Sequence, residues 1–192
     1  MTLATRITVF RIFMIPLYAW LAVSYGHSVA AGSPEESHRL AAMGVFLAAG
    51  LSDALDGWIA RRFQQHSRLG RILDPLADKC LMLTALIVLN LHPWSARHWI
   101  PWWFATVVIL RDVLSSLAAW AIARRHGRVQ IVPHWTGKLA TVLQLLALGW
   151  VMLQLPWPPW WAIMVPAAAI TFASGMVYIH KGWQQYRHVP QN

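Results

Sequence analysis

The chain has 192 residues, of which 57% are hydrophobic and 12% are charged, and its formal net charge is +9. This composition is too apolar for an ordinary soluble domain and is typical of a membrane protein with several helices. The basic residues lie in separate clusters between apolar stretches, which argues against nucleic acid as a partner. Anionic lipid headgroups or phosphate-bearing substrates are the partners that this charge favours.

Six apolar runs follow one another along the chain, each close to the ~20 residues that a membrane-spanning helix needs. The first run contains Arg11 and Pro16, which would interrupt the apolar core of a cleaved signal peptide, so a spanning helix is favoured there. We therefore expect an all-α, polytopic membrane protein with a single domain (1–192) and six transmembrane helices. The runs cover residues 7–25, 39–59, 72–92, 99–122, 135–155 and 160–180.

The loops between these runs alternate in charge. Most arginines and lysines lie at the two chain ends and after the second and fourth runs, whereas the other connections hold only Arg39 and Arg97. Because basic loops stay on the cytoplasmic side, we expect both termini in the cytoplasm of a bacterial-like inner membrane. Tryptophans gather at the opposite ends of the runs and predict an outer aromatic belt. They are Trp94, Trp99, Trp102, Trp103, Trp157, Trp160 and Trp161.

Four of the seven acidic residues are aspartates between positions 53 and 78. Asp53 and Asp56 are three residues apart. Asp74 and Asp78 are four residues apart, so each pair shares one face if its segment is helical. Carboxylates are costly beside hydrocarbon and usually mark a functional site in a membrane protein. Two helix ends that face each other would present four hard oxygen ligands, which suit Mg²⁺ or Mn²⁺.

Small residues accompany these aspartates at fixed positions. The spacing is Asp53-x₂-Asp56-Gly57-x₂-Ala60-Arg61-x₈-Gly70-x₃-Asp74-x₃-Asp78. Simple ion pairing of the aspartates with nearby arginines is an alternative, but it does not explain the small residues. The complete pattern resembles the signature of the CDP-alcohol phosphatidyltransferases, which are integral membrane enzymes of phospholipid synthesis. The resemblance extends over nearly the whole chain.

The resemblance implies transfer of a phosphatidyl group from CDP-diacylglycerol to an alcohol, with release of CMP. It implies two Mg²⁺ or Mn²⁺ ions held by the four aspartates, Asp78 as the general base, an active site that faces the cytoplasm, and a homodimer. Gly57 and Ala60 would leave room for the cytidine against the backbone, and Arg61 can reach a phosphate. The residues implied to bind the donor are Thr8, Arg11, Asp56, Gly57, Ala60, Arg61 and Gly70.

Two further basic residues inside apolar runs, Arg111 and Lys138, match family positions directed toward the acceptor. A structural pairing of Arg111 with Asp112 is the alternative, although neighbours in sequence point to different faces of a helix. The sequence also departs from the family near its start, where Ala4-Thr5 stand in place of a Pro-Asn pair. This departure affects the expected contacts with the donor.

The context of the motif resembles the glycerol-type branch of the family. Gly137-Lys138 favours sn-glycerol 3-phosphate as the acceptor, whereas Arg111-Asp112-Val113 favours phosphatidylglycerol, the acceptor of cardiolipin synthases. An acceptor that carries a phosphate needs cationic partners, so we favour glycerol 3-phosphate. Inositol phosphate, serine and choline remain open.

Three functions from other classes are weaker alternatives. A transporter or Mg²⁺ channel would usually show inverted repeats, which are not visible in the sequence. A pyrophosphate-using prenyltransferase would be expected to have two separate aspartate-rich motifs, whereas this chain has one bipartite cluster. A non-catalytic lipid binder would have no need of all four aspartates.

Overall fold

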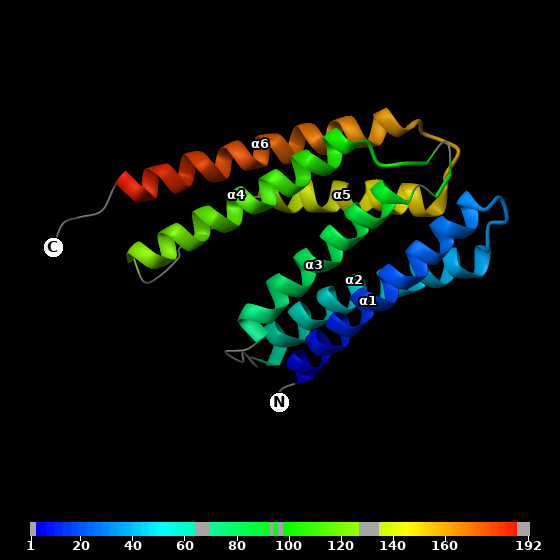
Figure 1. Ribbon diagram of the computed structural model, residues 1–192. Coiled ribbons are helices and arrows are strands. Elements are labelled where there is room, and N and C mark those ends of the chain that lie inside the picture. Colours follow the sequence, from blue (N-terminus) through cyan, green and yellow to red (C-terminus); the bar gives the residue numbers. More distant parts are fainter. Residues whose placement is uncertain (1–2, 64–69, 93, 96–97, 127–134, 188–192) are drawn as a thin grey trace. The chain divides into compact units, whose positions relative to one another are not determined.

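A computed structural model describes the chain except for residues 1–2, 64–69, 93, 96–97, 127–134 and 188–192. Side chains are also left undescribed in helical residues 3–9, 53–63, 70–75, 119–123, 125–126 and 181–187. The described part contains six helices and no strand, which confirms the expected all-α class (Figure 1). The helices are α1 (Leu3–Ala30), α2 (Glu36–Phe63), α3 (Gly70–Leu91), α4 (Trp102–His126), α5 (Trp135–Leu153) and α6 (Trp160–Arg187).

Two compact units make up the chain, and each is described by itself. The first unit, Met1–Ile100, contains α1, α2 and α3, and α1 packs against both of the other helices. The second unit, Pro101–Asn192, contains α4, α5 and α6, and here α6 packs against both of the others. The single domain over residues 1–192 stays a prediction.

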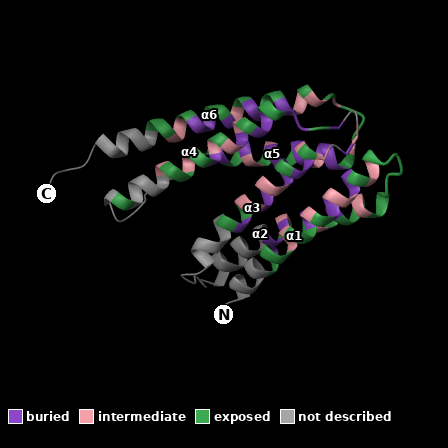
Figure 2. Cartoon of the chain, viewed as in Figure 1, coloured by how far each residue is buried: buried purple, intermediate pink, exposed green. Residues whose placement is uncertain are grey.

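Small residues bring the helices of the first unit close together. Ala22 of α1, Ala49 of α2 and Ala85 of α3 are fully buried, as is usual where helix backbones approach one another in a membrane protein. Figure 2 shows buried positions alternating with exposed ones along these helices. The chain packs tightly at Gly26, where a Cβ would lie 2.5 Å from the Cβ of His92. A side chain at position 26 would therefore push α1 away from the end of α3.

Polar side chains fix the turn from α1 to α2. Gly32 adopts a φ of 75°, a left-handed conformation that glycine tolerates, just after the last residue of α1. The Ser28 hydroxyl accepts a hydrogen bond from the backbone N–H of Glu35 at 3.0 Å. The Tyr25 hydroxyl donates to Glu36 Oε1 at 3.2 Å. These bonds tie the end of one helix to the start of the next.

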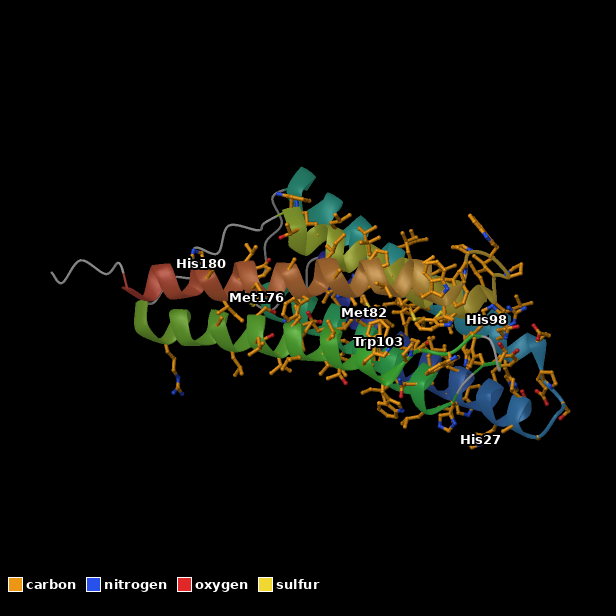
Figure 3. The ribbon with its side chains drawn as sticks, turned by 90° about the horizontal axis from the view of Figure 1, so that it is seen from above. His27, Met82, His98, Trp103, Met176 and His180 are labelled. Carbon is orange, nitrogen blue, oxygen red and sulfur yellow. The ribbon has the colours of Figure 1, made fainter. Side chains whose placement is uncertain are left out.

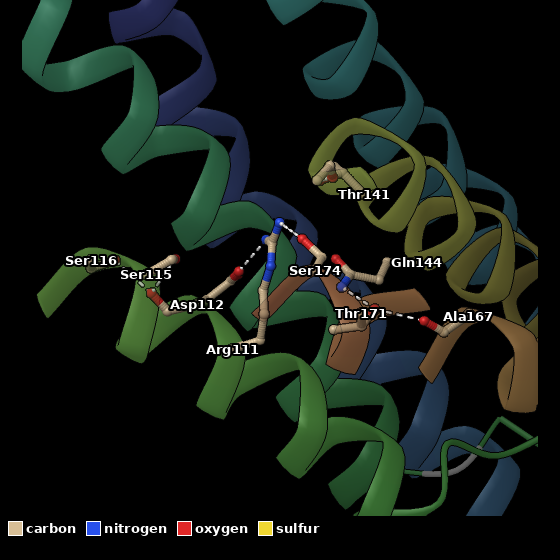
Figure 4. A network of polar contacts seen from close by, with 10 residues as sticks. Arg111, Asp112, Ser115, Ser116, Thr141, Gln144, Ala167, Thr171 and Ser174 are labelled. Atoms are coloured by element: carbon tan, nitrogen blue, oxygen red, sulfur yellow. Dashed lines mark hydrogen bonds and ion pairs between the residues drawn. The ribbon is translucent and has the colours of Figure 1, made fainter. Parts of the chain in front are cut away.

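The second unit has an apolar core that a polar contact between α5 and α6 crosses. Leu148 of α5 and Met164 of α6 are fully buried. Beside them the buried side chain of Gln144 donates from Nε2 to Thr171 Oγ1 at 2.9 Å, and Thr171 donates to the carbonyl of Ala167 at 2.7 Å (Figure 4). The Thr171 hydroxyl thus accepts from the Gln144 side chain and donates to a backbone carbonyl of α6, so these buried polar groups are hydrogen-bonded.

Large apolar side chains are exposed on both units, which is unusual for a soluble protein. Examples are Phe13, Leu51, Leu146 and Phe172, each more than half exposed. Three helices are long and apolar enough to cross a membrane, over Phe10–Ala30, Trp135–Leu153 and Trp160–His180. These features fit a membrane protein, while six spans with both termini in the cytoplasm stay a prediction. Each of the six apolar runs falls on one of the six described helices.

The tryptophans divide into two groups. Most of those expected in the aromatic belt are exposed, including Trp103 at the start of α4 (Figure 3). Trp94 differs, since it is buried, stacks edge-on against Tyr25 at 5.1 Å between ring centroids and donates from Nε1 to the carbonyl of Ala22 at 3.3 Å. Its place in the belt was therefore wrong, because the indole N–H finds its partner in α1.

The histidines that the structure describes in the first unit gather at the end opposite the aspartate motif. Figure 3 shows His27 and His98 at this end. The ring of His27 lies 5.0 Å from that of His92, and His98 is hydrogen-bonded to the Ser95 hydroxyl at 2.8 Å. His27 and His92 thus pack against each other, and His98 is held by the loop residue Ser95.

Candidate functional site

The aspartate motif lies at the junction of α2 and α3. Asp53 and Asp56 fall in the last part of α2, and Asp74 and Asp78 fall in the first turns of α3. Both spacings are therefore helical, so each pair shares one helix face as the sequence predicted. The side chain of Asp78 is exposed, whereas the other three lie outside the described side chains. The four-aspartate cluster consequently stays a prediction.

The donor-binding residues are distributed over all three helices of the first unit. Most of their side chains lie outside the described part of the structure, and Arg11 is the exception. Thr8 and Arg11 are in α1, Asp56, Gly57, Ala60 and Arg61 are in α2, and Gly70 begins α3. Since α1 packs against α2 and α3, the fold places these segments in one compact unit.

Arg11 is fully buried within this unit. Its Nε donates to the Ser52 hydroxyl at 3.5 Å, and Ser52 donates in turn to the carbonyl of Ala49 at 2.7 Å. Ser52 directly precedes the first aspartate of the motif. A buried guanidinium keeps its charge, so it needs acceptors around it. Its contact with α2 brings the cation of α1 to the start of the motif.

The second unit contains another arginine that is largely buried, Arg111 of α4. Its Nη1 donates to Asp112 Oδ1 at 2.7 Å, and both side chains are only 12% exposed. Its Nη2 donates to the Ser174 hydroxyl at 3.3 Å (Figure 4). The guanidinium carbon lies 5.7 Å from the centroid of the Tyr178 ring, within the range of a cation–π contact. Arg111 is thus held by its own helix and by α6.

The pairing of Arg111 with Asp112 corrects the geometric argument made from sequence. Neighbouring Cβ atoms do point to different helix faces, but the arginine side chain is long enough to bend back to the carboxylate. This pair engages only one end of the guanidinium, so an acceptor contact by the same arginine is compatible with it. The role of Arg111 toward an acceptor stays a prediction.

Gly137 of α5 completes the surroundings of this arginine. A Cβ at position 137 would lie 3.0 Å from the Tyr178 hydroxyl and 3.2 Å from Arg111 Nη2. Such contacts are too tight unless one of the neighbours moves. Lys138, the next residue, has an exposed side chain. The Gly137-Lys138 pair seen in the sequence therefore combines a space for the guanidinium with a second cation nearby in the chain.

Sequence reasoning missed three polar residues that hold these arginines. Ser52 contacts Arg11, and Ser174 and Tyr178 contact Arg111. A serine inside an apolar helix is common and carries little information by itself. For α6, the sequence did contain a signal. Ser174, Gly175 and Tyr178 are two polar residues and a glycine within little more than one turn of an otherwise apolar run, a pattern that can mark a helix–helix contact.

Comparison with known proteins agrees with the motif. The family model for CDP-alcohol phosphatidyltransferases matches residues 1–175, which include both units. The chain belongs to this family. It is 33% identical over 181 residues to a probable phosphatidylglycerophosphate synthase of Mycobacterium tuberculosis, covering 92% of this chain and 79% of that protein. It is 30% identical over 188 residues to the CDP-diacylglycerol–glycerol-3-phosphate 3-phosphatidyltransferase of Escherichia coli, covering 91% of each.

Membership in the CDP-alcohol phosphatidyltransferases identifies the chain as a membrane transferase. The donor set of the motif fits the divalent metal ions of such a site, because four carboxylates on two adjacent helices offer hard oxygen ligands. Among the side chains that the structure describes, no three acidic, histidine or cysteine groups come together, and three of the four aspartates fall outside that set. Only the positions of the four aspartates on α2 and α3 therefore support a metal site.

Proposed function

We propose that the protein transfers the phosphatidyl group of CDP-diacylglycerol to sn-glycerol 3-phosphate, forming phosphatidylglycerophosphate and CMP. The observation that carries this proposal is the similarity over about nine tenths of the chain to relatives named for this reaction or its product. Two features of the chain support it, namely the full aspartate motif on α2 and α3 and the largely buried cation Arg111 on α4.

In the proposed reaction the acceptor hydroxyl attacks the phosphorus on the lipid side of the pyrophosphate. A new phosphorus–oxygen bond forms, the bond to the CMP oxygen breaks, and the hydroxyl proton passes to the carboxylate of Asp78. Asp78 is suited to this role because its side chain is exposed one turn beyond Asp74 on α3. Asp53, Asp56 and Asp74, with Asp78, would hold two Mg²⁺ or Mn²⁺ ions, which supply charge neutralisation for the pyrophosphate.

Donor and acceptor are proposed to use different basic residues. Arg11 and Arg61, with Thr8 nearby, would bind the phosphates of the donor, and Gly57, Ala60 and Gly70 would leave space for the nucleotide. Arg111 and Lys138 would bind the phosphate of glycerol 3-phosphate. A guanidinium suits this task, because it recognises phosphate through two parallel hydrogen bonds.

We further propose that both units form one membrane domain with six spans. Both termini and the aspartate motif would face the cytoplasm of a bacterial inner membrane, since the basic loops lie at that end of the helices. A homodimer is proposed from the family alone. Reporter fusions at the two termini test the orientation, and chemical cross-linking in membranes tests the dimer.

CMP release tests the reaction itself. The purified protein would be assayed in detergent with CDP-diacylglycerol and Mg²⁺ or Mn²⁺, offering glycerol 3-phosphate, phosphatidylglycerol and inositol phosphate separately. Metal-dependent CMP release with glycerol 3-phosphate alone supports the proposal. Release with phosphatidylglycerol instead would identify a cardiolipin synthase, the alternative that the Asp112-Val113 sequence favours. No release from folded protein with any acceptor would contradict the enzymatic proposal.

A further inference from the structure

The guanidinium of Arg111 is held in place by contacts on several sides. Asp112 accepts from Nη1 at 2.7 Å and Ser174 accepts from Nη2 at 3.3 Å. The Tyr178 ring lies 5.7 Å from the guanidinium carbon, and Gly137 packs so close that a Cβ there would lie 3.2 Å from Nη2. These residues belong to three helices of the second unit, α4, α5 and α6, and Figure 4 shows the bonds to Asp112 and Ser174. They determine the orientation of the guanidinium plane and the position of its charge.

One edge of the guanidinium has donors that these contacts do not use. Arginine has five N–H donors, and Asp112 engages the Nη1 end. On the other edge, Nε is buried and has no hydrogen-bond partner among the described residues. Nη2 on that edge has only the longer contact to Ser174. A buried donor without a partner is costly, so this edge is suited to an acceptor that arrives with two oxygens, such as a phosphate.

We propose that Asp112 and Ser174 are positioning residues that present the Nε–Nη2 edge of Arg111 to the phosphate of the acceptor. This inference rests on the proposed function, in which Arg111 binds glycerol 3-phosphate. Asp112 fixes the far end of the guanidinium and balances its charge inside an apolar helix bundle. Ser174 accepts from one N–H of Nη2 at 3.3 Å, which leaves the second N–H of Nη2 for a phosphate oxygen. Neither residue touches the substrate in this arrangement.

Three roles for Asp112 give different kinetic results, so they can be separated. A positioning role predicts that loss of the carboxylate raises KM for glycerol 3-phosphate, because the arginine is no longer aligned. A competing role predicts the reverse, since removal of a rival anion would free Arg111 for phosphate. A purely structural role predicts that the variant has lower thermal stability. The folded fraction would then show unchanged KM values for both substrates.

The experiment measures steady-state CMP release by full-length Asp112→Asn, Asp112→Glu and Ser174→Ala enzymes, with each substrate varied in turn. We expect Asp112→Asn to raise KM for glycerol 3-phosphate about tenfold, as for loss of one charge-assisted hydrogen bond, without a matching change in KM for CDP-diacylglycerol. Asp112→Glu keeps the charge and should restore most of the affinity. Ser174→Ala should cause a smaller rise in the same constant.

A double-mutant cycle adds a second readout. If Asp112 acts through Arg111, Asp112→Asn should add nothing to the effect of Arg111→Gln on the acceptor KM. Additive effects, an unchanged acceptor KM or a lowered one would each overturn the inference. If Asp112→Asn does not give folded protein, the Ser174→Ala variant tests the proposal. An unchanged KM for glycerol 3-phosphate in Ser174→Ala would contradict the positioning role.

The wild-type assay separates this inference from the proposed function. Wild-type enzyme that does not turn over glycerol 3-phosphate overturns both. Wild-type enzyme that does, combined with variants whose acceptor KM is normal, overturns the positioning role alone.

Discussion

The two units each bury an arginine among apolar helices, and they do so in different ways. Arg11 is fully buried in the first unit and reaches across to Ser52 of α2, next to the aspartate motif. Arg111 in the second unit is paired with the carboxylate of the adjacent residue and is braced by Ser174 of α6. One cation thus reaches toward the acidic motif on another helix, and the other has its counter-ion beside it.

This difference indicates separate tasks for the two cations. A buried arginine is retained where its charge is needed, because burial without partners is costly. The contact of Arg11 places it beside the residues proposed to bind the pyrophosphate. Asp112 supplies Arg111 with a counter-ion on its own helix, separate from the four aspartates of the motif, and the Nε of Arg111 has no hydrogen-bond partner among the described residues. We therefore propose that Arg11 binds the donor and that Arg111 binds the acceptor.

The largest expected effect on activity is at Asp78, the proposed general base, and not at either arginine. Asp78→Asn should lower kcat by about 10²–10⁴-fold, because the amide cannot take the proton from the acceptor hydroxyl. CMP release would measure the loss, and binding of CDP-diacylglycerol should persist. Glu35→Gln, at an exposed carboxylate in the loop after α1, is the matched control and should remain active. Near-normal turnover in Asp78→Asn would rule out its role as base.

Substitution of the two arginines tests the comparison directly. Arg11→Gln should raise KM for CDP-diacylglycerol, and Arg111→Gln should raise KM for glycerol 3-phosphate, each by about 10–100-fold for a lost hydrogen bond to a charged group. The measurement varies one substrate while the other is saturating. The division between donor and acceptor would fail if both substitutions raised the same constant. Size-exclusion chromatography in detergent would confirm that both variants are folded.

Two glycines of α5 provide a smaller and well-controlled test. Gly137→Ala should destabilise the protein by about 1–3 kcal/mol, because the new methyl group meets Tyr178 and Arg111. It should also raise the acceptor KM. Gly149→Ala on the same helix meets no atom within 4 Å and should stabilise by about 0.5–1 kcal/mol through helix propensity. Thermal unfolding in detergent would measure both, and equal melting temperatures would contradict the proposed close packing.

The smallest effect is expected at the polar crossing between α5 and α6. Thr171→Val removes the hydrogen bond from Gln144 and should cost about 1 kcal/mol of stability. Both KM values and kcat should stay unchanged, because this pair is proposed to have a purely structural role. A changed acceptor KM would extend the functional network of the second unit beyond Arg111. Unfolding and CMP release by the same preparation would distinguish the two outcomes.

The helical placement of the aspartate motif was predictable from sequence because its signals are local. The spacing of Asp53 with Asp56, and of Asp74 with Asp78, places each pair on one face of any helix, and the structure has helices at both places. The sequence also indicated the Gly137-Lys138 pair. The structure explains the glycine, because a Cβ at position 137 would lie 3.0 Å from the hydroxyl of Tyr178, which is 41 residues away in the chain. Spacing alone could not show that contact.

The sequence by itself determined the all-α class, the location of six helices, the apolar character of the chain and the helical pairing of the aspartates. These properties follow from composition and from the helical period, which act over a few residues. Tertiary structure alone decided the partners of the buried groups. The bond from Arg111 to Ser174 joins residues 63 apart, and that from Trp94 to Ala22 joins residues 72 apart. Such contacts depend on which helix faces pack together, since a long polar side chain bonds to the acceptor that packing brings within reach.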